Sequence, residues 1–193
     1  MSSSVSICNQ ALGWLGQSPI TSFDDPGAAA QLCKQNYAEI RDAVLEEGSW
    51  SFASRRISLS PSATAPIFGY TYKFELPKDV LTVKTVSDNP DTVGLGDDDF
   101  QWDLEERYIM CNSPIIYAKA VVQITDTSKF SPMFTQVLAT RLAADFAVPL
   151  TQNEKLQTKY LQLYQVRMLD AVGADSIQGR NRRFRQRRYH KVR

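Results

Sequence analysis

The side chains that could do chemistry are few in this chain and poorly placed for catalysis. The sequence contains one histidine, His190, which lies in a basic segment near its end. A Ser-His-Asp triad, a Cys-His pair or a two-histidine metal site would each have to recruit that residue. We therefore predict that the protein is not an enzyme.

Cysteines and glycines form no binding motif either. Cys8, Cys33 and Cys111 lie far apart without a CxxC pair, so we expect buried thiols in a reducing compartment rather than a zinc site or a disulfide framework. Gly94-Leu95-Gly96 is followed by three aspartates, which would repel a phosphate group. Nucleotide binding is therefore not expected.

Acidic residues occur in three clusters, each with two interpretations. Asp97 to Asp99 could hold a hard cation, but they lack the alternating ligands of an EF-hand loop, which favours a solvated loop. The pairs Glu46-Glu47 and Glu105-Glu106 could serve sugar hydrolysis, although adjacent carboxylates point apart on a helix or strand. An enzyme that acts on the cell wall is thus a minor alternative.

The strongest compositional signal is an asymmetry of charge. The net charge is +1, yet Arg180 to Arg193 hold seven Arg, one Lys and no acid, while the remainder has 14 basic and 21 acidic residues. Guanidinium groups interleaved with rings can bind DNA phosphates, pair with an acidic protein groove, or stay solvated. We predict partner binding, to portal protein or to DNA, through Arg180, Arg182, Arg183, Phe184, Arg185, Arg187, Arg188, Tyr189, His190, Lys191 and Arg193.

Hydrophobic spacing predicts two helices at the start of the chain. The first follows the possible caps Ser2 to Ser4 and extends over Val5 to Leu15. The second is expected to start at Asp24-Asp25-Pro26 and to stop at Gly48. Trp50 and Phe52, just beyond that glycine, would anchor the chain on these helices.

Helical spacing returns in the last third of the chain. Ser131-Pro132 is a start signal for a helix that would end at Pro149. Thr151 and Glu154 match a capping box, which predicts a long helix ending at Gly173. The apolar residues of this last helix cover more than one stripe, so we expect it to contact both its own core and a neighbouring subunit.

Between the helical regions the hydrophobic period changes to two. Phe68 to Leu76 alternate most clearly, and four more strands are expected over Val80 to Val86, Phe100 to Leu104, Tyr108 to Cys111 and Ile115 to Ile124. The predicted fold class is α+β: N- and C-terminal helices form one bundle (residues 1–53 and 128–173) with an inserted antiparallel β-sheet or small barrel (residues 54–127) and an extended basic C-terminal tail (residues 174–193). No segment approaches the roughly 20 apolar residues that span a bilayer, so we expect a soluble protein.

Four segments, in this order, resemble the tail tubular protein A family, the head-to-tail adaptors of short-tailed phages. They are ICNQALGWLGQSPITSFDD, AVLEEGSWSFASRRISL, GYTYKFELPKDVLTVKTV and FSPMFTQVLATRLAADFAVPLTQNEKLQTKYLQLY, and together they cover most of Val5 to Tyr164. The Trp50-Ser51-Phe52 turn and the run from Tyr70 into Pro77 look like the family's most recognisable features.

The resemblance implies a structural virion protein in a ring of about twelve copies. Such a ring would bind the portal above and the tail nozzle, of the tubular protein B type, below, with tail fibres as further partners and DNA passing through the central channel. It implies no cofactor, and a location in the virion tail at the head-tail interface after assembly in the host cytoplasm. The C-terminal segment of such adaptors commonly reaches into the portal. The alternative is a nucleic-acid-binding channel protein that grips DNA through its Arg-rich tail.

Overall fold

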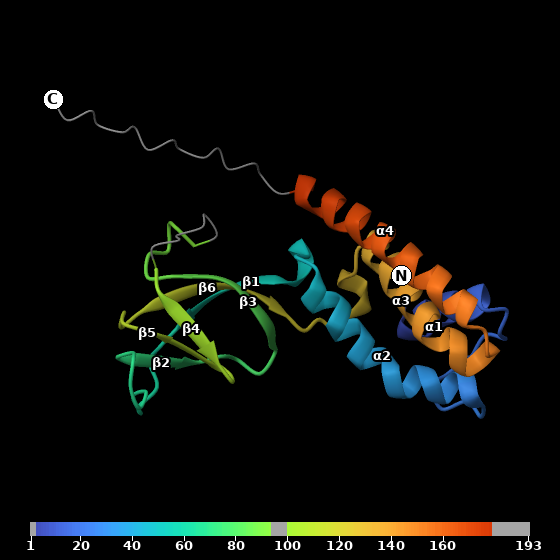
Figure 1. Ribbon diagram of the computed structural model, residues 1–193, viewed down its shortest axis with the longest axis horizontal. Helices are drawn as coiled ribbons and strands as arrows, with labels where there is room; N and C mark the ends of the chain where they lie inside the picture. Colours follow the sequence, from blue (N-terminus) through green and yellow to red (C-terminus); the bar gives the residue numbers. More distant parts are fainter. Residues whose placement is uncertain (1–2, 94–99, 179–193) are drawn as a thin grey trace.

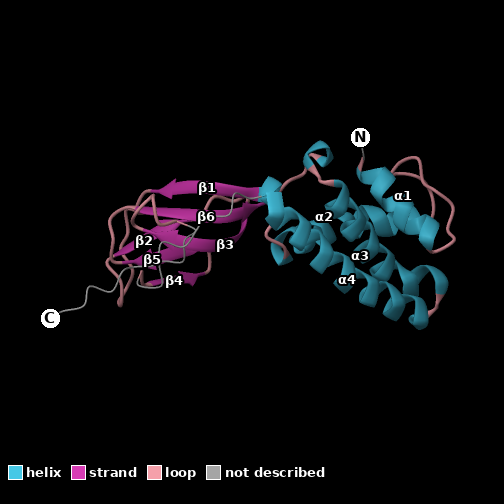
Figure 2. Cartoon of the chain, turned by 90° about the horizontal axis from the view of Figure 1, so that it is seen from above, coloured by secondary structure: helices cyan, strands magenta, loops and turns pink. Residues whose placement is uncertain are grey.

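The structure is a computed structural model that describes residues 3–93 and 100–178, and it has the predicted α+β class. Helices gather in one lobe and strands in a second lobe beside it (Figures 1 and 2). The helices are α1 (Ser4–Trp14), α2 (Ala28–Glu47), α3 (Pro132–Thr151) and α4 (Glu154–Gln178), with 3-10 turns at Ser51–Ala53 and Thr127–Lys129. The strands are β1 (Ser54–Leu59), β2 (Tyr72–Glu75), β3 (Val80–Ser87), β4 (Trp102–Glu105), β5 (Tyr108–Cys111) and β6 (Ile116–Val122).

Local capping explains where α1 and α3 begin. Ser3 and Ser6 form a reciprocal capping box, in which each hydroxyl accepts from the other residue's amide at 3.0 and 2.8 Å. The Ser131 hydroxyl accepts from the amide of Phe134 at 3.1 Å, and Pro132 occupies the first helical position. Both caps satisfy amides that have no partner inside the helix. These two predicted starts are confirmed.

The predicted start of α2 is wrong by a few residues. Asp25 does not cap this helix, because its carboxylate accepts from the amides of Thr21 at 2.6 Å and Ser22 at 3.1 Å in the preceding loop. The helix begins only at Ala28, after Gly27, whose φ of 132° other residues rarely adopt. Its predicted stop is confirmed, since α2 ends at Glu47 and Gly48 follows.

The junction between α3 and α4 also differs from the prediction. Pro149 lies inside α3, where it removes one amide donor in the last turn. Thr151 is the last residue of α3 rather than a cap, and its hydroxyl donates to the Ala147 carbonyl at 2.6 Å. Asn153 takes the capping role, accepting from the amide of Lys155 at 3.0 Å. The predicted capping box is therefore wrong.

Gly173 does not end α4, which continues to Gln178. Residues 174–178, predicted as the start of the tail, are therefore helical. The extension is held by Asp175, whose carboxylate accepts from the amide of Ser51 at 2.7 Å and from its hydroxyl at 2.8 Å. A tertiary contact thus overrides the weak helix preference of glycine.

The strands form two three-stranded antiparallel sheets rather than one sheet of about five strands. The first has the order β1-β6-β3 and the second β2-β5-β4. Strand β1 was not expected, because Arg55 and Arg56 interrupt its apolar alternation. The predicted strand over Phe68 to Leu76 shrinks to β2, and Ile67 and Phe68 lie exposed in the loop before it.

The two sheets pack on one another around a small core of their own. Phe74, Ile109 and Cys111 of the second sheet are fully buried, as are Ile116 and Ala118 of the first. Alternate residues of each strand point into this core and the others face solvent. The second sheet therefore keeps one free face, which the next subsection describes.

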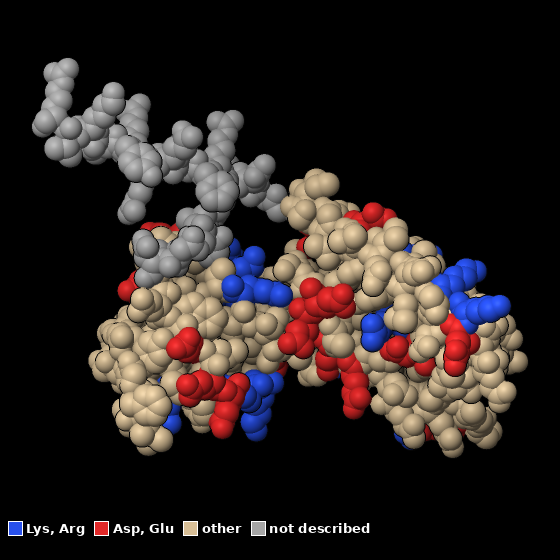
Figure 3. Space-filling model, viewed as in Figure 1, with Lys and Arg blue, Asp and Glu red and all other residues tan. Residues whose placement is uncertain are grey.

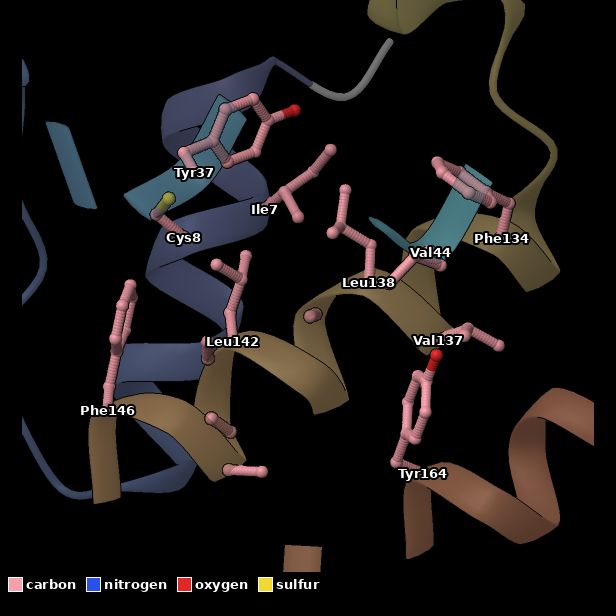
Figure 4. Packing of buried hydrophobic residues seen from close by; sticks show 14 of the residues in the cluster. Ile7, Cys8, Tyr37, Val44, Phe134, Val137, Leu138, Leu142, Phe146 and Tyr164 are labelled. Carbon is pink, nitrogen blue, oxygen red and sulfur yellow. The ribbon is translucent and has the colours of Figure 1, made fainter. Parts of the chain in front are cut away.

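The larger core lies in the helical lobe, where α3 contacts α1, α2 and α4. Figure 4 shows Leu138 and Leu142 of α3 among side chains from the surrounding helices. The α3 alanines are completely buried, which lets the neighbouring helices approach closely. Trp50 is also completely buried in this core; its indole N–H donates to the Val44 carbonyl at 2.9 Å and its ring meets Phe134 edge to face at 5.0 Å. Within residues 3–93 and 100–178, no helix is both long enough and apolar enough to cross a membrane.

Alanine at two glycines should affect stability in opposite directions. A Cβ at Gly48 would clash with the indole nitrogen of Trp50, whereas a Cβ at Gly13, inside α1, meets nothing within 4 Å. We expect Gly48→Ala to lower the free energy of unfolding by about 1–3 kcal/mol. Gly13→Ala should raise it by about 0.5 kcal/mol, because alanine favours helix. Urea unfolding followed by circular dichroism measures both, and equal effects of the two changes would contradict the packing described for Trp50.

Candidate functional site

The residues predicted to bind a partner, Arg180 to Arg193, lie outside the described residues. So do Asp97 to Asp99, the acidic cluster considered for a cation. Within the described ranges, no group of three His, Cys, Asp or Glu side chains could hold a metal ion. The candidate surfaces therefore have to come from what α4 and the two sheets expose.

The three cysteines are not accessible to solvent. Each is completely buried with a free thiol. Cys8 of α1 and Cys33 of α2 touch through their thiols, and this hydrogen bond together with burial raises the pKa of Cys8. Burial also raises the pKa of Cys111. The hydrogen bond between Cys8 and Cys33 lowers the pKa of Cys33. All three thiols are core residues, as predicted.

The inner face of α4 is fixed on the bundle by specific contacts. Tyr160, Tyr164, Met168 and Ala171 follow one another at helical spacing, and all are buried. The Tyr160 hydroxyl donates to the Trp14 carbonyl at 2.9 Å, and the Tyr164 hydroxyl donates to the Glu47 carboxylate. Burial, and then the bond to Glu47, raises the pKa of Tyr164 above its ordinary value. These contacts determine which face of α4 points outward.

Arg167 of α4 contacts both α3 and α1. Its guanidinium donates to the Thr140 hydroxyl of α3 at 2.6 Å and lies over the ring of Trp14 of α1, 4.9 Å from the ring centre. Both partners fix the plane of the guanidinium, so the rotation of α4 about its own axis is determined.

The outer face of α4 carries an exposed apolar stripe. Val166, Leu169 and Ile177 are 57%, 76% and 83% exposed, and Gly173 lies between the last two on the same face. The spacing i, i+3, i+7 and i+11 keeps these four positions within about one quarter of the helix circumference. We call these four residues the α4 stripe. Large exposed apolar side chains on one helix face are typical of a protein-protein contact.

A second candidate surface is a hollow on the free face of the β2-β5-β4 sheet. The strand register places Lys73, Met110 and Asp103 in one cross-strand row on this face. Tyr108 and Glu105 form part of the next row. The hollow has a volume of about 450 Å³.

The wall of the hollow is the loop from Ala65 to Tyr70. Ile67 and Phe68 stand on it with 98% and 86% of their surface exposed. The loop is anchored after these residues, because the Tyr70 hydroxyl donates to the Asp103 carboxylate at 2.7 Å and the Thr71 amide donates to Asn112 at 3.0 Å. The bond to Asp103 also raises the pKa of Tyr70. The wall is thus tied to the sheet at its end, and two apolar side chains face outward.

The rim of the hollow is acidic. Asp103, Glu105 and Glu106 line it against one cation, Lys73, whose ammonium group lies 5.0 Å from the centre of the Tyr108 ring. Among the residues that the structure describes, none of the three acids forms an ion pair. We call this site the sheet hollow, and it combines apolar walls with unpaired negative charge.

Acidic side chains also gather where the two lobes meet, on the face that Figure 3 shows. The pair Glu46-Glu47 ends α2. Its two carboxylates are consecutive on one helix and therefore point apart, and Glu47 accepts a hydrogen bond from Tyr164. The described part of the molecule offers no geometry for two-carboxylate hydrolysis at this pair.

The chain matches no model of a known protein family, and a search of curated proteins also found no match. The α4 stripe and the sheet hollow are therefore the features from which a function can be inferred.

Sequence reasoning found one of the two surfaces. The apolar residues of the predicted helix indicated an outer apolar face, and the exposure of Val166 and Leu169 agrees with that prediction. Gly173 and Ile177 were predicted as the helix stop and as part of the tail, so their place in the α4 stripe was missed. The sheet hollow was missed, because Phe68 and Tyr70 were assigned to an alternating strand and Ile67 was assigned to no element. Pro66 before them and Gly69 after them, with its φ of 84°, were the available signals for a loop.

The tyrosine that ties α4 to α2 should make stability depend on alkaline pH. Tyr164→Phe should lower the free energy of unfolding by about 1 kcal/mol at pH 7, since it removes one hydrogen bond. The pKa of Tyr164 is raised in the folded protein above the value of 10.0 in the free side chain. Its contribution is therefore fully present below pH 10 and is lost as the pH rises toward the folded pKa. Urea titrations should show a smaller difference in the free energy of unfolding between wild type and variant at pH 10.5 than at pH 7. An equal difference at the two pH values would contradict a stabilising role of the protonated Tyr164 hydroxyl.

Proposed function

We propose that this chain is a structural subunit of a virion, the head-to-tail adaptor of a short-tailed phage, and that it acts by assembly rather than by catalysis. The α4 stripe is the observation that carries the proposal. Three large apolar side chains lie exposed in a row on a helix whose other face is fixed in the core. The exposed side chains do not stabilise a monomer, whereas contact with a second subunit would bury them.

The resemblance of four ordered segments to the tail tubular protein A family supports the particular assembly. In that assembly about twelve copies form a closed ring around the DNA channel, with the portal above and the tail nozzle below. A ring needs two different surfaces on each subunit, because the contacts are head to tail. The α4 stripe supplies one of them.

The C-terminal basic segment has a separate role in this proposal. Arg180 to Arg193 follow directly on α4, so the segment starts at the end of the helix that carries the α4 stripe. Guanidinium groups can pair with portal carboxylates, while Phe184 and Tyr189 supply apolar area. Each subunit of the ring would thus contribute one basic segment to the contact with the portal.

Polar substitution in the α4 stripe should dissociate the ring. We expect Leu169→Gln combined with Ile177→Gln to raise the subunit dissociation constant at least about 100-fold, since each buried aliphatic side chain contributes about 1.5–3 kcal/mol. Analytical ultracentrifugation measures the constant, and electron microscopy with and without portal shows the rings directly.

The matched control for this experiment is Ile115→Gln. Ile115 is 53% exposed but lies in the strand lobe, before β6. Its substitution should leave the assembly unchanged. Equal association of the α4 double variant and wild type would overturn the role of the stripe.

Removal of the basic segment tests the second part of the proposal. A chain cut after Gly179 should keep its helical circular dichroism and its rings, because the core of the helical lobe and the α4 stripe are built from residues before Gly179. Binding to purified portal should be lost, and a pull-down with portal measures this. Retained portal binding would contradict the docking role of Arg180 to Arg193.

The same truncated chain tests the DNA-binding alternative. If the segment binds DNA, the full chain should bind duplex DNA at low salt with an affinity that falls steeply as salt is added. The truncated chain should then lose this binding, and absence of DNA binding by the full chain at low salt would exclude the alternative. The adaptor proposal expects the chain to lose portal binding on truncation whether or not such weak DNA binding is present.

A further inference from the structure

We propose that the sheet hollow is a docking site for the basic segment of this same chain, residues 179–193, held in place until another partner takes that segment. The inference goes beyond the adaptor role and does not depend on it. It depends on the shape and charge of the hollow and on the composition of the segment.

The sheet hollow has the features of a site for an extended peptide. Its floor is a flat sheet face, and its wall is a loop anchored by Tyr70 and Thr71. β4 is an edge strand of the β2-β5-β4 sheet, so an extended segment could lie beside it and use its free backbone groups. The exposed Ile67 and Phe68 stand above this floor as apolar contacts for a ring or an aliphatic chain.

The charge of the hollow selects a basic occupant. Three carboxylates line it against one ammonium group, and Lys73 is engaged with the Tyr108 ring. Glu105 and Glu106 form no ion pair within the described part of the chain. Nucleic acid would be repelled at such a rim, and an acidic or purely apolar segment would leave its charges unpaired.

The basic segment has the complementary composition. Arg180 to Arg193 contain eight cations and no acid, with Phe184 and Tyr189 between them. Arginine pairs with carboxylates through two parallel hydrogen bonds, and its plane stacks on aromatic rings such as Phe68 and Tyr108. The same segment therefore offers both kinds of contact that the hollow provides.

The segment starts beside the strand lobe and is long. The end of α4 lies at the junction of the two lobes, where Asp175 accepts from Ser51 just before β1. The fifteen residues after Gln178 span up to about 50 Å when extended. The segment therefore has the length to extend along the strand lobe of its own chain.

Docking in the hollow would shield the cations before assembly. Eight positive charges beside an acidic body favour unspecific contacts with nucleic acid and with other copies. A portal that binds the segment more tightly would then free the sheet face, so that one binding event exposes a second surface. This would order the steps of assembly.

Methionine methyl NMR tests the proposal directly, because the chain has a methionine in the hollow and two controls outside it. Met110 lines the hollow, Met133 is exposed on α3, and Met168 is buried in the bundle. The Met110 methyl resonance should differ between the full chain and a chain ending at Gln178, and added peptide of residues 179–193 should restore it. The Met133 and Met168 resonances should stay unchanged, which also reports that the shortened chain is folded.

Charge variants separate specific docking from general attraction. Glu105→Gln combined with Glu106→Gln should weaken peptide binding by about tenfold, because two exposed ion pairs are lost. Glu39→Gln combined with Glu46→Gln removes the same charge from the exposed face of α2 and should leave the affinity within about twofold. Phe68→Ser should also weaken binding, through lost apolar contact.

Two results would overturn the proposal. One is a Met110 resonance that is identical in the full and shortened chains and does not move with the peptide. The other is equal loss of affinity in the two charge variants, which would mean that the segment responds only to net charge. Neither result bears on ring formation through the α4 stripe, so this inference and the adaptor proposal can fail separately.

Discussion

The burial of Trp50 at the point where the chain leaves the helices is the interaction on which the rest of the structure depends. Its indole N–H donates to the Val44 carbonyl near the end of α2, and its ring packs edge to face on Phe134 of α3. Its own carbonyl accepts from the Ser54 hydroxyl at 2.9 Å at the first residue of β1. The Trp50 side chain therefore joins two helices that are distant in sequence, and the Trp50 backbone carbonyl contacts the first residue of β1.

This anchor explains why the two lobes share a defined junction. Val121 of β6 belongs to the helical core, and Gln123, just beyond β6, donates to Asp42 of α2 at 2.7 Å. The end of α4 is tied to the same region through Asp175 and Ser51. The outward faces of α4 and of the β2-β5-β4 sheet are consequently presented by a single framework, and neither has to be ordered when a partner arrives. Preorganised surfaces lose less entropy on binding.

The two candidate surfaces differ in chemistry, and this difference suits different partners. The α4 stripe is apolar and uncharged, which favours contact with another folded helix or core-like surface. The sheet hollow mixes apolar side chains with carboxylates that form no ion pair within the described part of the chain, which favours an extended basic segment. A subunit with both can associate with its own kind at one place and recognise a charged segment at another without competition between the two.

The sequence by itself determined the α+β class, the order of the four helices, every described strand except β1, a cap among Ser2 to Ser4 and the cap at Ser131. Periodicity and capping act over a few neighbouring residues, which is why these features could be predicted. It also indicated that residues 154–173 have more apolar surface than one core can use. Only the tertiary structure decided that Gly173 stays helical and that Ile67 and Phe68 form the wall of a hollow. Those outcomes depend on Ser51 meeting Asp175 and on Tyr70 meeting Asp103, contacts between residues 124 and 33 positions apart. Local propensity contains no information about such partners. Glycine costs a helix about 1 kcal/mol, and the two hydrogen bonds of Asp175, each worth about 0.5–1.5 kcal/mol, offset that cost.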